Sequence, residues 1–357
     1  MVKKLLMAGM VFGSVLAAPF SHARSNGALA SPSTRYSYLA FTVQQGNTSD
    51  IYVMTPDGKL WANLTRTPLA SEQFPTWSSD GTQIAFISGN NGGMDIYVTT
   101  TEHNGTTRQL THGIELLGGP VWSPTGQQIA FVAYNYQIAL ISATGERIAV
   151  FAPWMVEDPI TWSPDGRYIA YASTMNEKGE YMNDYDIFVF DIDANLTAIT
   201  AESNPLPAWF PENPLNAVPP INITNTPNQR EFAPSWSPNG KQFAFLWGHT
   251  GLVHVMDVNG ETIRSLTSTP FTGHSPAAGD GWPTWSPDGQ LVAFASNRGK
   301  VYGNDLYIVN VDGTSFRRIT HFPDKQGLLI FGPKWSPWLD EPLDLDWEPT
   351  PWSVSEE

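Results

Sequence analysis

Six tryptophan–serine pairs recur in a similar sequence frame along this chain, at intervals that cover most of its length. The copies are Trp77-Ser78, Trp122-Ser123, Trp162-Ser163, Trp236-Ser237, Trp285-Ser286 and Trp335-Ser336, most of them in a frame close to Pro-x-Trp-Ser-Pro-Asp-Gly. A motif that returns in this way is typical of a repeat protein built from one supersecondary unit. We therefore predict an array of one small unit, in which these six tryptophans pack in the core or between units.

Each unit is predicted to consist of four short strands. In the fifth copy the first strand is 283–285, a Ser-Pro-Asp-Gly turn spans 286–289, and an apolar-Ala-aromatic strand follows at 292–294. Proline and glycine supply the backbone angles of such a turn, and short β-branched or aromatic runs suit strands. A third strand at 305–308 and an outer strand at 317–320 complete the unit. Four strands in this order form one blade of a β-propeller.

The partial units at the two ends predict how the ring closes. The first unit, from about Tyr38, has no Trp-Ser strand before it, and residues 333–337 form a Trp-Ser strand with no unit after it. Pairing the two removes two exposed sheet edges. We predict an all-β, six-bladed β-propeller of four-stranded antiparallel blades, closed by pairing of the C-terminal Trp-Ser strand with the first blade. The proline-rich stretch 201–220 is interpreted as a loop inserted in the fourth blade, since proline disfavours central strands.

These motifs resemble the TolB-like six-bladed β-propeller family. The likeness rests on the Trp-Ser-Pro-Asp-Gly turn, on strands such as Val292-Ala293-Phe294 and on strands such as Asp50-Ile51-Tyr52, and it covers residues 38–337. The proteins that give this family its name carry an α/β domain before the propeller, whereas here residues 24–37 separate the predicted cleavage point from the first predicted strand. The resemblance implies a protein that binds a protein or peptide partner and performs no chemistry of its own.

The first 23 residues are predicted to be a signal peptide. Lys3 and Lys4 precede an apolar run from Leu5 to Ala18, and small residues stand at Ser21 and Ala23, the pattern of a cleavage site. With no cysteine in the chain, neither a lipid anchor on a cysteine nor a disulfide is expected. We predict a periplasmic or secreted protein without stable membrane insertion.

The charge of the chain excludes one class of partner. The net charge is −15, and removal of Lys3 and Lys4 with the leader lowers it to −17, so nucleic acid and anionic membrane surfaces are disfavoured. Much of the excess lies in the acidic, tryptophan-containing tail 338–357. We predict a solvated, disordered end, with a peptide that docks on a partner or folds back over the propeller as the alternative.

Function is expected on the long loops, which join the outer strand of one blade to the inner strand of the next and the second strand to the third. Both sets emerge on the same face, and long loops on a rigid frame commonly carry binding residues. An aromatic patch rimmed by charges suits a peptide or a sugar ring. The predicted partner-binding residues are Glu72, Glu115, Glu157, Asp158, Trp154, Trp209, Arg230, Glu231, His274, Asp280, Trp282, Arg298 and Lys325.

No catalytic motif is recognisable. The chain lacks a Gly-x-Ser-x-Gly elbow, a phosphate loop and metal-ligand spacing among its dispersed histidines, so we predict no catalytic residue, no metal site and no cofactor. The repeated Asp50, Asp95, Asp186 and Asp305 are expected to make structural hydrogen bonds. The preferred hypothesis is an exported protein that binds a protein or peptide partner in the cell envelope. The alternative is a carbohydrate-active lyase or hydrolase that uses loop carboxylates and aromatics on glycan or peptidoglycan fragments.

Overall fold

The computed structural model describes residues 35–349 except for 68, 91–92, 154, 176–179, 202–217, 227–228, 249–250, 262, 269–278 and 326. The predicted signal peptide, most of segment 24–37 and the last eight residues therefore lie outside the described residues. So do most of the predicted insertion 201–220 and the side chains of Trp154, Trp209 and His274.

The described residues form antiparallel sheets of short strands, as the all-β prediction requires. Four sheets have four strands each. They consist of β8 (Val121–Trp122), β9 (Gln128–Ala133), β10 (Gln137–Ser142) and β11 (Arg147–Phe151); β12 (Glu157–Trp162), β13 (Tyr168–Met175), β14 (Tyr181–Asp191) and β15 (Ile221–Asn222); β16 (Glu231–Trp236), β17 (Gln242–Trp247), β18 (Leu252–Asp257) and β19 (Ile263–Ser265); and β20 (Asp280–Trp285), β21 (Leu291–Ser296), β22 (Asp305–Asn310) and β23 (Arg317–Arg318). Helical structure among the described residues is confined to α2 (Ile192–Ala201) and the 3-10 turn η1 (Tyr134–Tyr136). The prediction of four-stranded antiparallel units is confirmed.

A fifth sheet contains nine strands. Its members are β24 (Leu328–Trp335), β1 (Leu39–Gln45), β2 (Thr48–Met54), β3 (Leu60–Asn63), β25 (Glu348–Pro349), β4 (Ser71–Trp77), β5 (Gln83–Asn90), β6 (Gly93–Thr100) and β7 (Thr107–Gln109). A single parallel pair, Ser49 opposite Ser71, joins β2 to β4, and the two hydroxyl oxygens lie 2.8 Å apart. On either side of this bridge the strands pair antiparallel.

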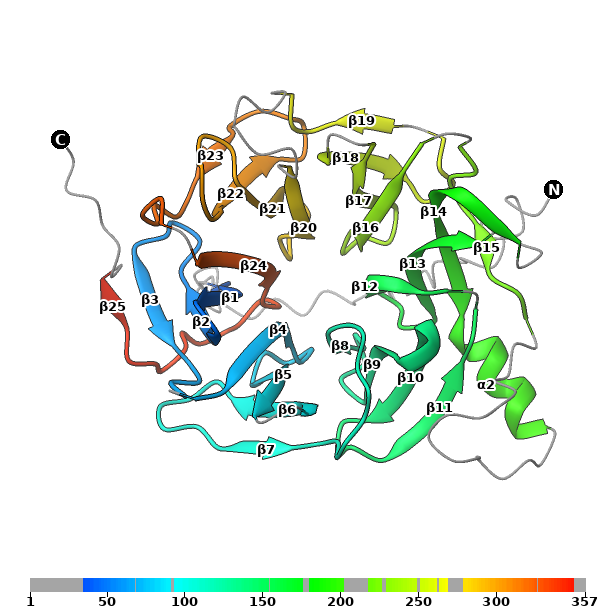
Figure 1. Cartoon of the computed structure of the whole chain (residues 1–357), viewed down its shortest axis with the longest axis horizontal. Coiled ribbons are helices and arrows are strands. Elements are labelled where there is room, and N and C mark those ends of the chain that lie inside the picture. Colours follow the sequence, from blue (N-terminus) through cyan, green and yellow to red (C-terminus); the bar gives the residue numbers. More distant parts are fainter. Residues whose placement is uncertain are drawn as a thin grey trace, which may run out of the picture.

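The sheets follow one another in chain order around a common centre (Figure 1). Strands β4, β8, β12, β16, β20 and β24 lie nearest to that centre, and each of them ends at one of the six tryptophans. Strand β24 pairs antiparallel with β1, with Leu39 opposite Trp335 and Gln45 opposite Leu328. The C-terminal Trp-Ser strand therefore lies beside the first strand of the chain.

The Trp-Ser-Pro-Asp-Gly segment forms a tight turn held by its serine. The Ser286 hydroxyl donates to Asp288 Oδ1 at 2.5 Å and accepts from the Leu291 N–H at 2.9 Å. Gly289 closes the turn with φ of 69°, a conformation that favours glycine. The same serine-centred bonds occur at Ser78 and Ser163, which explains why the sequence repeats these residue types.

The six repeated tryptophans link neighbouring sheets. All are at most 9% exposed. The indole N–H of Trp77 donates to the Lys334 carbonyl at 3.1 Å, and that of Trp285 donates to the Ser235 carbonyl at 3.0 Å. The acceptor of Trp285 belongs to the inner strand of the preceding sheet, and Trp162 repeats this arrangement on Val121. Lys334 lies in β24, within the same nine-stranded sheet as Trp77. The predicted packing role of these tryptophans is confirmed.

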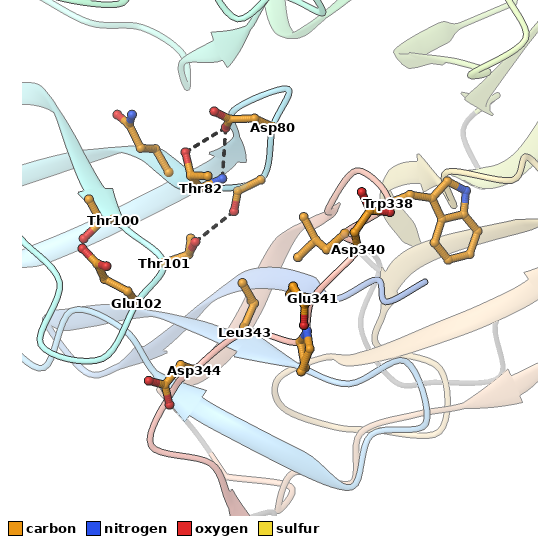
Figure 2. Close-up of a pocket in the computed structure, with 14 residues that line it drawn as sticks. Asp80, Thr82, Thr100, Thr101, Glu102, Trp338, Asp340, Glu341, Leu343 and Asp344 are labelled. Atoms are coloured by element: carbon orange, nitrogen blue, oxygen red, sulfur yellow. Dashed lines mark hydrogen bonds between the residues drawn. The ribbon is translucent and has the colours of Figure 1, made fainter. Parts of the chain in front are cut away.

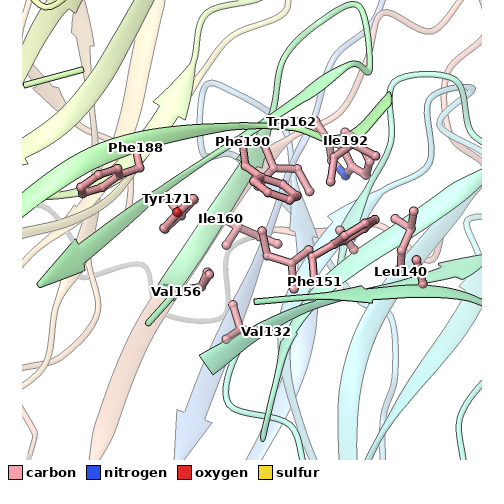
Figure 3. Packing of buried hydrophobic residues seen from close by; sticks show 14 residues of the cluster. Val132, Leu140, Phe151, Val156, Ile160, Trp162, Tyr171, Phe188, Phe190 and Ile192 are labelled. Carbon is pink, nitrogen blue, oxygen red and sulfur yellow. The ribbon is translucent and has the colours of Figure 1, made fainter. Parts of the chain in front are cut away.

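Between adjacent sheets the core is aromatic and aliphatic. Figure 3 shows the cluster between the sheet of β8–β11 and that of β12–β15, in which Phe151, Tyr171, Phe188 and Phe190 are fully buried. The alanine of the apolar-Ala-aromatic strand 129–131, Ala130, is also fully buried and packs in this cluster. Truncating one such ring typically costs about 3–5 kcal/mol.

The repeated aspartates hold the outer strands. Asp186 Oδ2 accepts from the Asn222 amide at 2.7 Å, and Oδ1 accepts from the Thr224 hydroxyl at 3.1 Å and the Thr226 N–H at 3.2 Å. Equivalent threonines donate to Asp50, Asp95 and Asp305. The predicted structural role of these aspartates is confirmed. Their carboxylates accept hydrogen bonds from side-chain hydroxyls as well as from backbone N–H groups.

Residues 338–349 of the acidic tail fold back onto the first strands. Leu339 forms a two-bond bridge with Tyr36, and the Trp347 ring stacks on Tyr38 with centroids 5.3 Å apart. Strand β25 then pairs with β3. The apolar side chains of the tail account for this docking. The predicted disordered end is therefore wrong for residues 338–349, which fold back onto the protein as the alternative prediction had it. Within the described ranges, no helix has the length and apolar character to cross a membrane.

Candidate functional site

A small cavity lies where the inner strands converge. Residues of β4, β12, β20 and β24 and of the segment 119–121 line it, and its volume of about 20 Å³ is room for one small group. The lining contains two aromatic side chains, Phe74 and Trp282, and two charged ones, Asp158 and Lys334. We call it the axial cavity.

A repeated bulge directs side chains toward the axial cavity. The pairing of β4 with β5 shifts register between Gln73 and Thr76, and that of β20 with β21 shifts between Gly281 and Thr284. Within these bulges Phe74 and Trp282, each three residues before the repeated tryptophan, have φ of 56° and 50°. Bulges re-aim side chains and are frequent next to functional sites. The bulges in β4 and β20 thus place Phe74 and Trp282 in the lining of the axial cavity.

The axial position in the segment before β8 requires a glycine. A Cβ atom at Gly119 would lie 2.5 Å from the Cβ of Phe74, too close for any larger residue without displacement. The N–H of Gly119 also donates to Asp158 Oδ1 at 3.2 Å. Gly119 therefore lets Phe74 and Asp158 approach each other across the cavity.

The two charged groups perturb each other without forming an ion pair. Burial raises the pKa of Asp158 to about 7, although Lys334 and the Gly119 N–H act in the opposite direction. Burial lowers the pKa of Lys334, and the charge of Asp158 opposes that shift. Near neutral pH the cavity therefore combines a carboxyl group that is partly protonated with the amine of a half-buried lysine.

Three of the predicted binding carboxylates lie buried beneath the surface. Glu72, Glu231 and Asp280 occupy the same place, five residues before a repeated tryptophan, and are 2%, 0% and 7% exposed. Glu231 Oε1 accepts from the Thr226 hydroxyl at 2.6 Å, and burial raises the pKa of Glu231 to about 7. Asp280 pairs with Arg298 at 2.5 Å. These carboxylates therefore contact other residues of the protein beneath the loops.

The other predicted residues are spread around the ring. Arg298 lies over the ring of Phe316, 4.6 Å from its centroid, while Glu115, Arg230 and Lys325 are exposed and Glu157 is half-buried. Of the predicted set, the axial cavity brings together Asp158 and Trp282. Phe74 and Lys334, which also line it, were not among the predicted site residues.

Aligning the repeats by their tryptophans would have revealed the lysine. Lys334 stands directly before Trp335, where the other five repeats have Thr76, Val121, Thr161, Ser235 and Thr284. One charged residue in a column of small uncharged ones is a visible departure from a packing motif. The sequence alone does not show that the residue before each repeated tryptophan lies near the centre, because the fold determines this position.

A second hollow lies between the folded-back tail and the turns around Asp80 and Glu102 (Figure 2). Its volume is about 440 Å³, and the tail contributes Asp340, Glu341 and Asp344 to its lining. The Asp80 carboxylate accepts from the Thr82 hydroxyl and N–H, as the dashed lines show. No residue lines both hollows, so this acidic groove is separate from the axial cavity.

Comparisons with known proteins agree with the observed architecture. The family described as the TolB beta propeller domain matches residues 21–212. The Tol-Pal system protein TolB of Francisella tularensis subsp. mediasiatica (strain FSC147) is 24% identical over 296 residues, which cover 76% of this chain and 55% of that protein. The chain thus spans about half the length of the curated relatives it matches.

Two solved structures have a similar fold. TolB from Acinetobacter baumannii superimposes with a TM-score of 0.63 at 20% identity, covering 84% of this chain and 66% of that one. A putative TolB from Agrobacterium tumefaciens gives a TM-score of 0.53 at 18% identity, with 85% and 99% coverage. At these identities the likeness concerns the fold.

Proposed function

The chain belongs to the TolB beta propeller domain family, and from this premise we propose that it is an exported, Tol-Pal-related protein that binds a protein or peptide partner. The partner would dock on the face around the axial cavity, in the periplasm. The family supports a binding role, and curated relatives such as TolB of Francisella tularensis are Tol-Pal system proteins. The predicted signal peptide of residues 1–23 is the route of export in this proposal.

A closed ring of six blades over residues 38–337 is part of the proposal. The nine-stranded sheet would be two blades, because a single Ser49–Ser71 pair joins its two antiparallel sets. Pairing of β24 with β1 supports closure through the C-terminal strand. With four further sheets, this division gives six units. The insertion 201–220 and the tail 338–357 would be additions to that ring.

The axial cavity is the observation that carries the binding role. It sits at the convergence of rigid inner strands and combines aromatic walls with one acid and one base. Ligand sites are commonly concave and mostly apolar with a few placed polar groups. Arg230 and Lys325, which are exposed on the predicted long loops, would extend the contact outward.

The carbohydrate-active alternative requires two carboxylates facing one substrate bond. Among the described residues that line the axial cavity, Asp158 is the one carboxylate. Glu72 and Glu231 are buried in threonine hydrogen bonds instead. At the axial cavity the described geometry therefore favours binding over acid–base catalysis.

Affinity capture from a cell-envelope extract tests the proposal, with the mature chain from residue 24 as bait and Tol-Pal components analysed first. We expect a stoichiometric partner whose recovery falls when Arg230→Glu and Lys325→Glu reverse the charge of the predicted face. Lys59→Glu, an exposed change in the β2–β3 turn, is the matched control. Recovery that is equal for all three variants, or the absence of any stoichiometric partner, would contradict the proposed function.

A further inference from the structure

Lys334 is an exception among the inner-strand residues. Its position in β24 corresponds to threonine, serine or valine in the other five repeats. Lys334 is half-buried, and an ammonium group that loses part of its hydration is costly unless an acceptor compensates it. A packing role would be served better by the residues used elsewhere in the column.

The buried Lys300 shows what a compensated lysine looks like in this protein. Its ammonium group lies 2.7 Å from Asp305 Oδ2 and donates to the Phe322 carbonyl at 2.8 Å. For Lys334 the described residues provide no hydrogen-bond acceptor and no carboxylate within 4 Å. Its three N–H donors therefore remain available to a group that enters the axial cavity.

Asp158, across the cavity, complements an anion better than a cation. Its Oδ1 already accepts from Gly119, and burial favours its protonated form. A protonated carboxyl group donates a hydrogen bond. A cation in the same space would be repelled by Lys334. Of the residues lining the cavity, Asp158 and Lys334 alone are titratable, and Glu157 acts on Asp158 from outside.

We propose that the axial cavity binds one carboxylate group, held by the ammonium of Lys334 and by the carboxyl group of Asp158. The volume of about 20 Å³ limits the ligand to one small head group. Phe74 and Trp282 also line the cavity, and apolar walls strengthen charge-assisted hydrogen bonds. The inference rests on the proposed function for the source of the carboxylate, which would be the C-terminus or an acidic side chain of the bound peptide.

Acetate is the probe, and the readout is the NMR signal of the lysine ε-CH₂ groups in ¹³C-lysine-labelled mature protein. The Lys334 signal is assigned by its loss in Lys334→Met. We expect a saturable shift of this signal with acetate, while that of Lys59 moves only with bulk ionic strength. A Lys334 signal that does not saturate, or that follows Lys59, would overturn the proposal.

Asp158→Asn separates the carboxylate site from a general effect of salt. In the unsubstituted protein the acetate affinity should fall by up to about tenfold per pH unit above 7, because Asp158 ionises and repels the ligand. Asparagine at this position keeps a hydrogen-bond donor but does not ionise, so the acetate affinity of the variant should not show this fall above pH 7. An identical pH dependence in both proteins would contradict the role of Asp158.

Model ligands distinguish the two sources of the carboxylate. Glycylglycine carries a free C-terminus, its amide does not, and the α-amide of N-acetyl-aspartate offers only a side-chain carboxylate. Failure of this site and failure of the proposed function give different results. Saturable acetate binding without a captured partner would sink only the proposed function, whereas a captured partner with no acetate effect on Lys334 would sink only the carboxylate site.

Discussion

Leu39 and Trp335 lie opposite each other in the antiparallel pair of β1 and β24, although they come from the two ends of the described chain. The Tyr38 N–H donates to the Ser336 hydroxyl at 2.9 Å and extends the same pairing. The nine-stranded sheet thus contains strands from both ends of the described chain, and its stability depends on residues that only long-range contacts bring together.

Trp335→Ala should therefore destabilise the whole protein. Trp335 is 9% exposed and packs in the cluster of Leu39 and Phe41. We expect a loss of about 3–5 kcal/mol in the free energy of unfolding, measured by urea denaturation. Trp338→Ala is the control, because this ring is 38% exposed and its loss should change stability by about 0.5 kcal/mol or less. Similar effects of the two substitutions would contradict the importance of the pairing.

Asp305→Asn should be severely destabilising. Asp305 is fully buried and pairs with Lys300 at 2.7 Å and Arg318 at 2.5 Å, so its neutralisation leaves Lys300 buried without a counter-charge. A loss of about 3–5 kcal/mol is expected from thermal or urea unfolding. For comparison, Asp57→Asn breaks an exposed pair with Lys59 and should cost about 1 kcal/mol or less. A cost for Asp305→Asn as small as that would show that Lys300 finds other compensation.

Titration of the Glu231 carboxyl group should lower the free energy of unfolding as the pH rises. Burial raises its pKa to about 7 in the folded protein, so the folded state holds the proton more tightly than the unfolded state, where the pKa is near 4.5. This contribution is complete below pH 4.5 and is lost as the pH rises to about 7. Its size is on the order of 2–3 kcal/mol.

Glu231→Gln isolates this contribution, because glutamine is neutral throughout. The free energy of unfolding of the variant, relative to the unsubstituted protein, should be higher at pH 8 than at pH 5. Taking the difference cancels other titrating groups such as Asp158. A difference that is the same at both pH values would show that Glu231 titrates normally.

Trp347→Ala should release the tail without unfolding the sheets. The substitution removes the stack on Tyr38 and the indole bond to the Leu343 carbonyl. We expect amide hydrogen exchange in β3 to accelerate, since β25 covers its outer edge, while β5 and β9 stay protected. Asp344→Ala, an exposed change in the same segment, should leave exchange unchanged. Unaltered protection of β3 in Trp347→Ala would mean that the tail is held by other contacts.

Local sequence signals predicted the strands well. The run Val292-Ala293-Phe294 falls inside β21, and the turn residues around Gly289 lie where the motif placed them, because turn chemistry and short β-rich runs act locally. The inner strands begin earlier than predicted, however. Strand β20 starts at Asp280 rather than at 283, so a carboxylate expected on a loop lies inside a sheet.

The axial cavity depends on features that lie outside local signals. The positive φ of Phe74 and Trp282 arises from a register shift between neighbouring strands, which is set by tertiary pairing. Whether Lys334 meets a counter-charge depends on Asp158, a residue 176 positions away in the sequence. The docking of Trp347 on Tyr38 likewise pairs segments that no local pattern connects.

The pairing of Tyr38 with Ser336 spans 298 positions, and this separation dictates an order of events during synthesis. The N-terminal strand emerges first, and the strand that covers it emerges near the end. Until then its hydrogen-bonding edge is open to intermolecular pairing, the situation in which newly made β proteins aggregate. A chaperone that shields residues 38–45 until translation is finished would protect this protein at its most vulnerable stage.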